Sequence, residues 1–169
     1  MKRIIFIIIC LSFFSCSHGP HPTEAVEFND GIVFRQDTFY IHLDELLQLI
    51  KEEANSEIVT EKHKQLFQYT EQSLKYYETH TAFDKEDELR LAAVEYFSTQ
   101  LKMLNNEFSQ LIKLYSLPVT EIDPEHDIQW DSLMNALVYM DSVAVDNFLQ
   151  EQKHFADKYG ITLKEIDGQ

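Results

Sequence analysis

Glycine and cysteine are scarce in this chain of 169 residues, which has 4 glycines and 2 cysteines. No glycine-rich loop of the kind that holds phosphates, no dinucleotide fingerprint and no G-x-S-x-G motif is present. Both cysteines, Cys10 and Cys16, lie near the start of the chain, and neither belongs to a CxxCH haem motif. The sequence therefore predicts a protein that is not an enzyme and has no cofactor.

Basic residues are also few. The chain has 14 Lys and Arg against 29 Asp and Glu, and its formal net charge is −15 at pH 7. A polyanion is repelled by nucleic acid and by anionic lipid surfaces. We therefore expect no nucleic-acid partner, and any membrane attachment must have a source other than surface charge.

The first residues of the chain predict a lipid anchor as the source of membrane attachment. Lys2-Arg3 precedes an apolar run, residues 4–14, which is shorter than the roughly 20 residues that span a bilayer. Phe13-Phe14-Ser15-Cys16 resembles the lipobox of bacterial lipoproteins, in which the cysteine receives a diacylglycerol and becomes the new N-terminus. We therefore predict a signal peptide at residues 1–15 and a lipidated Cys16, with a tether at residues 16–23.

Apolar residues recur at three- and four-residue steps through the remaining chain, and alternating strand patterns are missing. This periodicity predicts an all-α fold, an antiparallel four-helix up-down bundle over residues 24–160, with a tail at residues 161–169. The expected helix boundaries are Thr23 as the first N-cap, a stop near Asn55, Asp84 as an N-cap, and a last helix between Asp123 and Gly160. Because 36 residues in one helix overshoot the partner helices, we expect a bend near Asp141-Ser142.

Several polar residues fall in the apolar phase of these helices. They form a predicted polar seam of Asn29, Gln36 and His63, accompanied by Thr70 and Gln100. One interpretation is that these side chains form hydrogen bonds between helices and fix the helix register. The other is a polar pocket at one end of the bundle. We favour the first.

Helical bundles often carry metal sites in their cores and aromatic residues at their surfaces. A di-iron site needs two ExxH motifs, and this chain has one, Glu151 with His154, beside a reversed pair, His42 with Glu45. We expect no metal site, and these four residues are the only weak candidates. Tyr76 and Tyr77 could belong to an exposed aromatic patch, although filling of the core explains most of the aromatic residues.

The first predicted helix also carries a resemblance. Phe28-Asn29-Asp30, Ile32-Val33 and Gln36 match an aromatic-Asn-Asp/Asn-x-Ile-Val-x-x-Gln pattern. With the lipobox, this resembles a group of small helical lipoproteins of Bacteroidota and related bacteria that have no established activity. Gly31 departs from the helix-favouring residue of that pattern, and as a helical glycine it costs about 1 kcal/mol relative to alanine.

The resemblance implies a location and a fold but no chemistry. Acidic residues often follow the cysteine in lipoproteins of such bacteria that reach the cell exterior, whereas Ser17-His18-Gly19-Pro20 follows it here. We therefore expect an outer-membrane lipoprotein that faces the periplasm. The leading hypothesis is a lipid-anchored, non-enzymatic bundle that presents a surface to another envelope protein. The alternatives are a lipoprotein that holds a small ligand or metal in or at the end of the bundle, and a cell-surface sensor.

Overall fold

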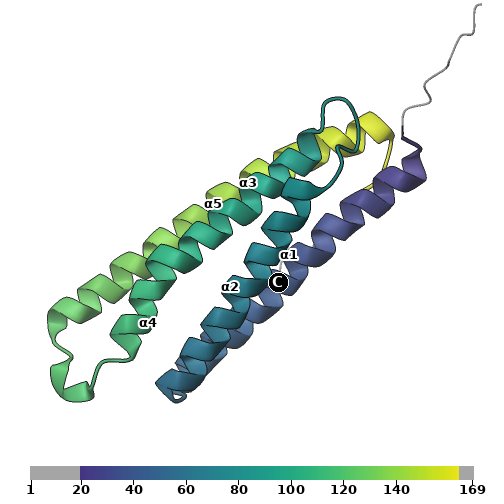
Figure 1. The fold of residues 1–169 in the computed structure, drawn as a ribbon. Coiled ribbons are helices and arrows are strands. Elements are labelled where there is room, and N and C mark those ends of the chain that lie inside the picture. The colour runs from purple at the N-terminus through teal and green to yellow at the C-terminus, as the bar shows by residue number, and fades with distance from the viewer. Residues whose placement is uncertain (1–19, 164–169) are drawn as a thin grey trace, which may run out of the picture.

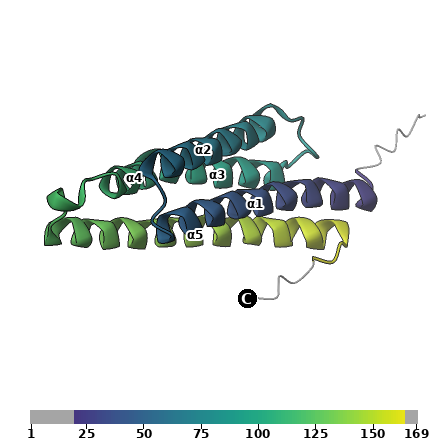
Figure 2. The same ribbon diagram turned by 90° about the horizontal axis from the view of Figure 1, so that it is seen from below.

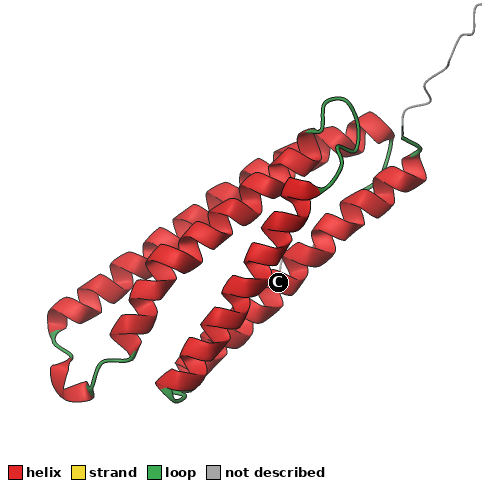
Figure 3. Ribbon diagram, viewed as in Figure 1, coloured by secondary structure: helices red, strands yellow, loops and turns green. Residues whose placement is uncertain are grey.

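The computed structural model describes residues 20–163, and all of its regular elements are helices (Figure 3). In chain order these are α1 (Pro22–Lys51), α2 (Ser56–Thr79), α3 (Glu88–Met103), the π-helical turn η1 (Leu104–Phe108), α4 (Ser109–Tyr115), the 3-10 turn η2 (Val119–Glu121) and α5 (Pro124–Tyr159). Since η1 joins α3 to α4, the bundle has four long helical segments, and the predicted all-α bundle is confirmed. The predicted signal peptide, Cys16, the first part of the tether and residues 164–169 lie outside the described residues.

The long helices alternate in direction around the bundle (Figures 1 and 2). On α1 and α5, Asn29 is bonded to Gln152 and Tyr40 to Asp141, so residue numbers rise on one helix as they fall on the other. The pairs that join α1 to α2, Tyr69 with Arg35 and Lys62 with Glu45, follow the same rule. Within the described residues, no helix is both long enough and apolar enough to cross a membrane.

The start of α1 corrects the predicted boundary. The N-cap is His21 rather than Thr23, because the His21 ring accepts a hydrogen bond from the Thr23 backbone N–H, and the Glu24 carboxylate accepts one from the His21 N–H. Pro22 fills the first helical position, where a missing N–H costs nothing. The bundle therefore begins at residue 22, and the predicted tether includes the first two helical residues.

The link between α1 and α2 corrects a second boundary. Asn55 does not end α1, which stops at Lys51; its side-chain oxygen instead accepts a hydrogen bond from the Glu57 N–H at 2.7 Å. Asn55 is thus the N-cap of α2. Asparagine suits either end of a helix, so its type alone could not decide between them.

The prediction that Asp84 is a helix N-cap is also wrong. The N-cap of α3 is Asp87, and Asp84 lies in the preceding loop, where it accepts hydrogen bonds from the Lys158 ammonium at 2.8 Å and the Tyr159 hydroxyl at 2.5 Å. Burial alone would raise the pKa of Asp84, but the hydrogen bonds from Lys158, Tyr159 and the Asp87 N–H lower it well below its usual range. This carboxylate therefore ties the α2–α3 loop to the end of α5.

The predicted limits of α5 are confirmed. Asp123 caps it through the backbone N–H groups of Glu125 and His126, and Gly160 ends it with a left-handed φ of 64°. The helix is continuous over 36 residues and runs straight in Figure 2, so the bend expected near Asp141-Ser142 is absent. Asp141 instead receives hydrogen bonds from two other helices.

The core has two buried apolar clusters, one toward each end of the bundle. One includes Ile32, Phe97 and Phe148, and the other includes Phe39, Leu66 and Leu111. Tyr40 packs against both clusters, and its hydroxyl donates to Asp141. A polar layer therefore separates the two halves of the core.

Candidate functional site

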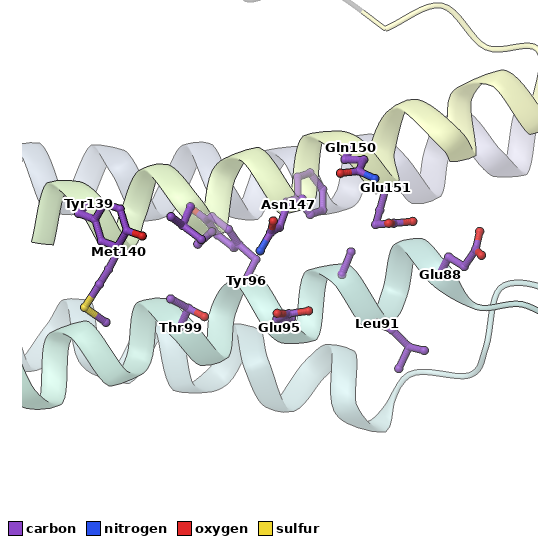
Figure 4. A pocket seen from close by; sticks show the side chains of 14 residues that line it. Glu88, Leu91, Glu95, Tyr96, Thr99, Tyr139, Met140, Asn147, Gln150 and Glu151 are labelled. Carbon is purple, nitrogen blue, oxygen red and sulfur yellow. The ribbon is translucent and has the colours of Figure 1, made fainter. Parts of the chain in front are cut away.

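A groove lies between α3 and α5 (Figure 4). It encloses about 560 Å³ and lies above small residues, Ala92 on α3 and Ala144 on α5. Since these side chains end at Cβ, the two helices leave a trough between them instead of filling it with side-chain atoms. The buried rings of Tyr96 and Phe148 form the rest of the floor.

Apolar side chains remain exposed along this groove. Tyr139 is 71% exposed, Leu91 51% and Val143 41%. Figure 4 shows Tyr139 and Met140 at one end of the groove, and Glu88 and Glu151 toward the other. Isolated exposed apolar residues are normal, but several around one concave surface mark an interaction site more often.

The charges at the groove all have one sign. Glu88 and Glu95 on α3 and Glu151 on α5 line it, and none of its lining residues is Lys or Arg. The uncharged polar groups are amides and hydroxyls, such as Asn147 and Thr99. A groove with an apolar floor and a carboxylate rim is suited to an occupant with apolar and cationic groups.

A polar cluster lies beneath the groove. The Tyr40 hydroxyl and the Gln100 amide both donate to one oxygen of Asp141, at 2.9 and 2.6 Å. Burial, with the nearby Tyr40 hydroxyl and Asp141 carboxylate, raises the pKa of Tyr96 far above its usual range, so this hydroxyl stays protonated. These groups connect α1, α3 and α5 at the middle of the bundle. They offer an ordered support for the groove but no nucleophile at its surface.

The predicted polar seam residues occupy three different settings. Asn29 is 6% exposed and accepts a hydrogen bond from the Gln152 amide at 2.8 Å. The ring of His63 donates from Nε2 to the Leu104 carbonyl at 2.9 Å. Gln36 is half-buried and forms no hydrogen bond with another side chain of residues 20–163. Asn29 and His63 thus join helices, whereas Gln36 does not.

The bond of His63 coincides with η1. Leu104 begins this π-helical turn, and its carbonyl also accepts a hydrogen bond from the Ser109 hydroxyl at 3.1 Å. Burial lowers the pKa of His63, and the bond to Leu104 opposes this only in part. The ring is therefore a neutral donor at pH 7. Such turns are single-residue expansions of an α-helix, and the periodicity of the sequence gave no sign of this one.

The weak metal candidates stay in two separate pairs. His154 and Glu151 are 3.5 Å apart on α5, while His42 and Glu45 are 3.2 Å apart on α1. The Lys62 ammonium contacts both His42 and Glu45 and so supplies the cation at that pair. Over residues 20–163, no three His, Cys, Asp or Glu side chains are grouped to hold a metal ion.

Our reading of the sequence missed the groove. The sequence signal for it was a second apolar stripe on α5, formed by Tyr139 and Val143, which is out of phase with the buried residues Ala144 and Phe148.

The chain matches no protein-family model. Nor does any curated protein or any solved structure match it.

Proposed function

We propose that this protein is a lipid-anchored, non-enzymatic component of the bacterial envelope that binds a helix of a partner protein in the α3–α5 groove. Cys16 would carry the lipid and hold the bundle at the periplasmic side of the outer membrane. The proposal depends above all on one observation, the exposed apolar residues of a concave groove with only acidic charges.

The shape of the groove supports a helical occupant. Its lining runs from Glu88 to Thr99 on α3 and from Tyr139 to Glu151 on α5, about 18 Å of helix on each side. An amphipathic helix of about twelve residues has this length, and its apolar stripe would cover Leu91 and Val143. An extended strand is less suitable, because two helices offer no row of unpaired backbone groups to pair with it.

The charge of the groove supports a basic occupant. Lys or Arg beside the apolar stripe would lie near Glu88, Glu95 and Glu151. The same carboxylates would repel an acidic helix, and they would repel the groove of a second copy of this chain. We therefore propose a partner helix with one apolar face bordered by Lys or Arg.

Two synthetic peptides test this proposal. Each has about twelve residues and one leucine stripe, and the stripe is bordered by Lys in one peptide and by Glu in the other. We expect the purified protein to bind the Lys peptide at least about tenfold more tightly, with an affinity that falls as salt is added. Fluorescence anisotropy of the labelled peptides measures both quantities.

Matched variants place the peptide in the groove. Tyr139→Ser should weaken binding, whereas Val138→Ser, which changes a residue that is 66% exposed but outside the groove, should not. Glu95→Lys should reduce the preference for the Lys peptide, and Glu71→Lys on α2 is its control. Equal binding of both peptides, or equal effects of Tyr139→Ser and Val138→Ser, would contradict the proposal. A concentration-dependent dimer in ultracentrifugation that Tyr139→Ser converts to monomer would also contradict the proposal, because a second copy of this chain would then occupy the groove.

The anchor has a separate test. Cys16→Ala should move the protein from the membrane fraction to the soluble fraction, because no lipid can then be attached. Unchanged fractionation would refute the anchor but would leave the groove proposal standing. The resemblance to small helical lipoproteins of Bacteroidota stays a prediction.

A further inference from the structure

A second hollow lies on another face of the bundle, between α1 and α2, the helices that lie side by side in Figure 1. It encloses about 390 Å³, within the range of small-molecule sites. Aromatic side chains form most of its walls: Phe28, Phe34, Tyr69, Tyr76 and Tyr77. Phe34 is 70% exposed and Tyr76 42%, whereas Tyr77 is buried and so belongs to the core and not to an exposed patch with Tyr76.

Gly31 leaves this hollow open. It lies in the interior of α1, where glycine is less stable than alanine, and its φ is not in the left-handed region. A Cβ added at Gly31 would meet no atom within 4 Å. Neither the backbone nor the packing of residues 20–163 therefore requires a glycine here. A ligand that lies against the helix would require one, because a side chain would occupy its place.

Arg35 gives the hollow its chemical preference. Its guanidinium carbon lies 4.1 Å from the centre of the Tyr76 ring and 5.9 Å from that of Tyr77. No carboxylate of residues 20–163 forms an ion pair with it. Stacking on an aromatic ring holds the guanidinium plane, and the N–H groups along its edge can then bind a carboxylate from the side.

Glu27 limits the occupant further. It lines the same hollow two helical turns before Arg35, about 12 Å away along the axis. One end of the hollow is therefore cationic and the other anionic. A ligand with one carboxylate fits this arrangement, whereas a second carboxylate would approach Glu27.

We propose that the α1–α2 hollow binds a small molecule that has an aromatic ring and one carboxylate. The ring lies against the Gly31 backbone between Phe34 and Tyr76, and the carboxylate binds the guanidinium of Arg35. This site is separate from the α3–α5 groove and does not depend on the function proposed for it.

The scarcity of glycine makes the test direct. The full chain has 4 glycines, so labelling with ¹⁵N-glycine gives few amide signals, and Gly31→Ala identifies the one from Gly31. The probe is indole-3-acetate, and its control is the uncharged indole-3-acetamide. We expect the Gly31 signal to shift saturably with the acetate, at a Kd of about 1 mM, while the Gly160 signal stays in place.

Two variants test the residues. Arg35→Gln should weaken binding of the acetate about tenfold and remove the preference over the acetamide. Gly31→Leu should abolish binding, because the added side chain fills the hollow, while the circular dichroism spectrum stays helical. If Gly31→Leu unfolds the protein, binding of the acetate by Arg35→Gln still tests the proposal. No shift of Gly31 at about 10 mM probe, equal binding of the acetamide, or full binding by Arg35→Gln would each overturn the proposal.

Discussion

Removal of the Asn29 side chain should destabilise the bundle, because it leaves the buried amide of Gln152 without a hydrogen-bond acceptor. Asn29 and Gln152 are each 6% exposed, and their hydrogen bond of 2.8 Å joins α1 to α5 across 123 positions of the chain. Asn29→Ala leaves the Gln152 amide buried without its acceptor. An unsatisfied buried donor costs about 1–3 kcal/mol, so we expect the free energy of unfolding to fall by about 2 kcal/mol.

A double-mutant cycle separates the bond from the side chains. Asn29→Ala, Gln152→Ala and the double variant should show a coupling of about 1 kcal/mol. Replacement of both residues by leucine should cost less than either single change to alanine, because no polar group is then left unpaired. Urea unfolding measures these values, and a loss of 2 kcal/mol should lower the midpoint by about 1 M.

The control is Gln68→Ala, at an exposed position on α2. It should change the free energy of unfolding by less than about 0.5 kcal/mol. The reasoning is refuted if Asn29→Ala is equally harmless, or if the cycle gives no coupling.

Two further predictions concern groups that titrate. Asp84→Asn should lower the free energy of unfolding by on the order of 2 kcal/mol, because the hydrogen bonds from Lys158 and Tyr159 lose their charged acceptor. The folded pKa of Asp84 is depressed, so its contribution to the free energy of unfolding is present above the unfolded pKa of about 4 and is lost as pH falls below it. Urea unfolding at pH 7 and pH 3 measures this loss. The free energy of unfolding should differ less between the two pH values in Asp84→Asn than in the unchanged protein. The folded pKa of His63 is also depressed, so stability again falls as pH decreases, in this case below the unfolded pKa of about 6.5. His63→Gln keeps a donor for Leu104, so it should reduce the slope of stability against pH between about 6.5 and 5; an unchanged slope would contradict the burial of this ring.

The candidate site was harder to predict than the fold. The helical period of apolar residues marks which faces are buried, but Tyr139 and Val143 are as apolar as the residues of the core. Whether such a stripe is covered depends on how many helices surround it. Part of the α1–α2 hollow could be predicted from the sequence, because a glycine inside a helical pattern is itself a signal. Its aromatic walls on α2, however, come from a segment about forty residues later in the chain.

The sequence by itself determined the all-α class and both ends of α5, because Asp123 with Pro124 and the left-handed Gly160 act on backbone groups within a turn of their own positions. Only the tertiary structure decided the role of Asp84 and the partner of Asn29. Each of these polar groups could be satisfied locally or by a distant helix, and the choice depends on which helices face one another. The α3–α5 groove and the α1–α2 hollow also depend on the tertiary structure, because each forms only where two helices pack together and no third helix covers them.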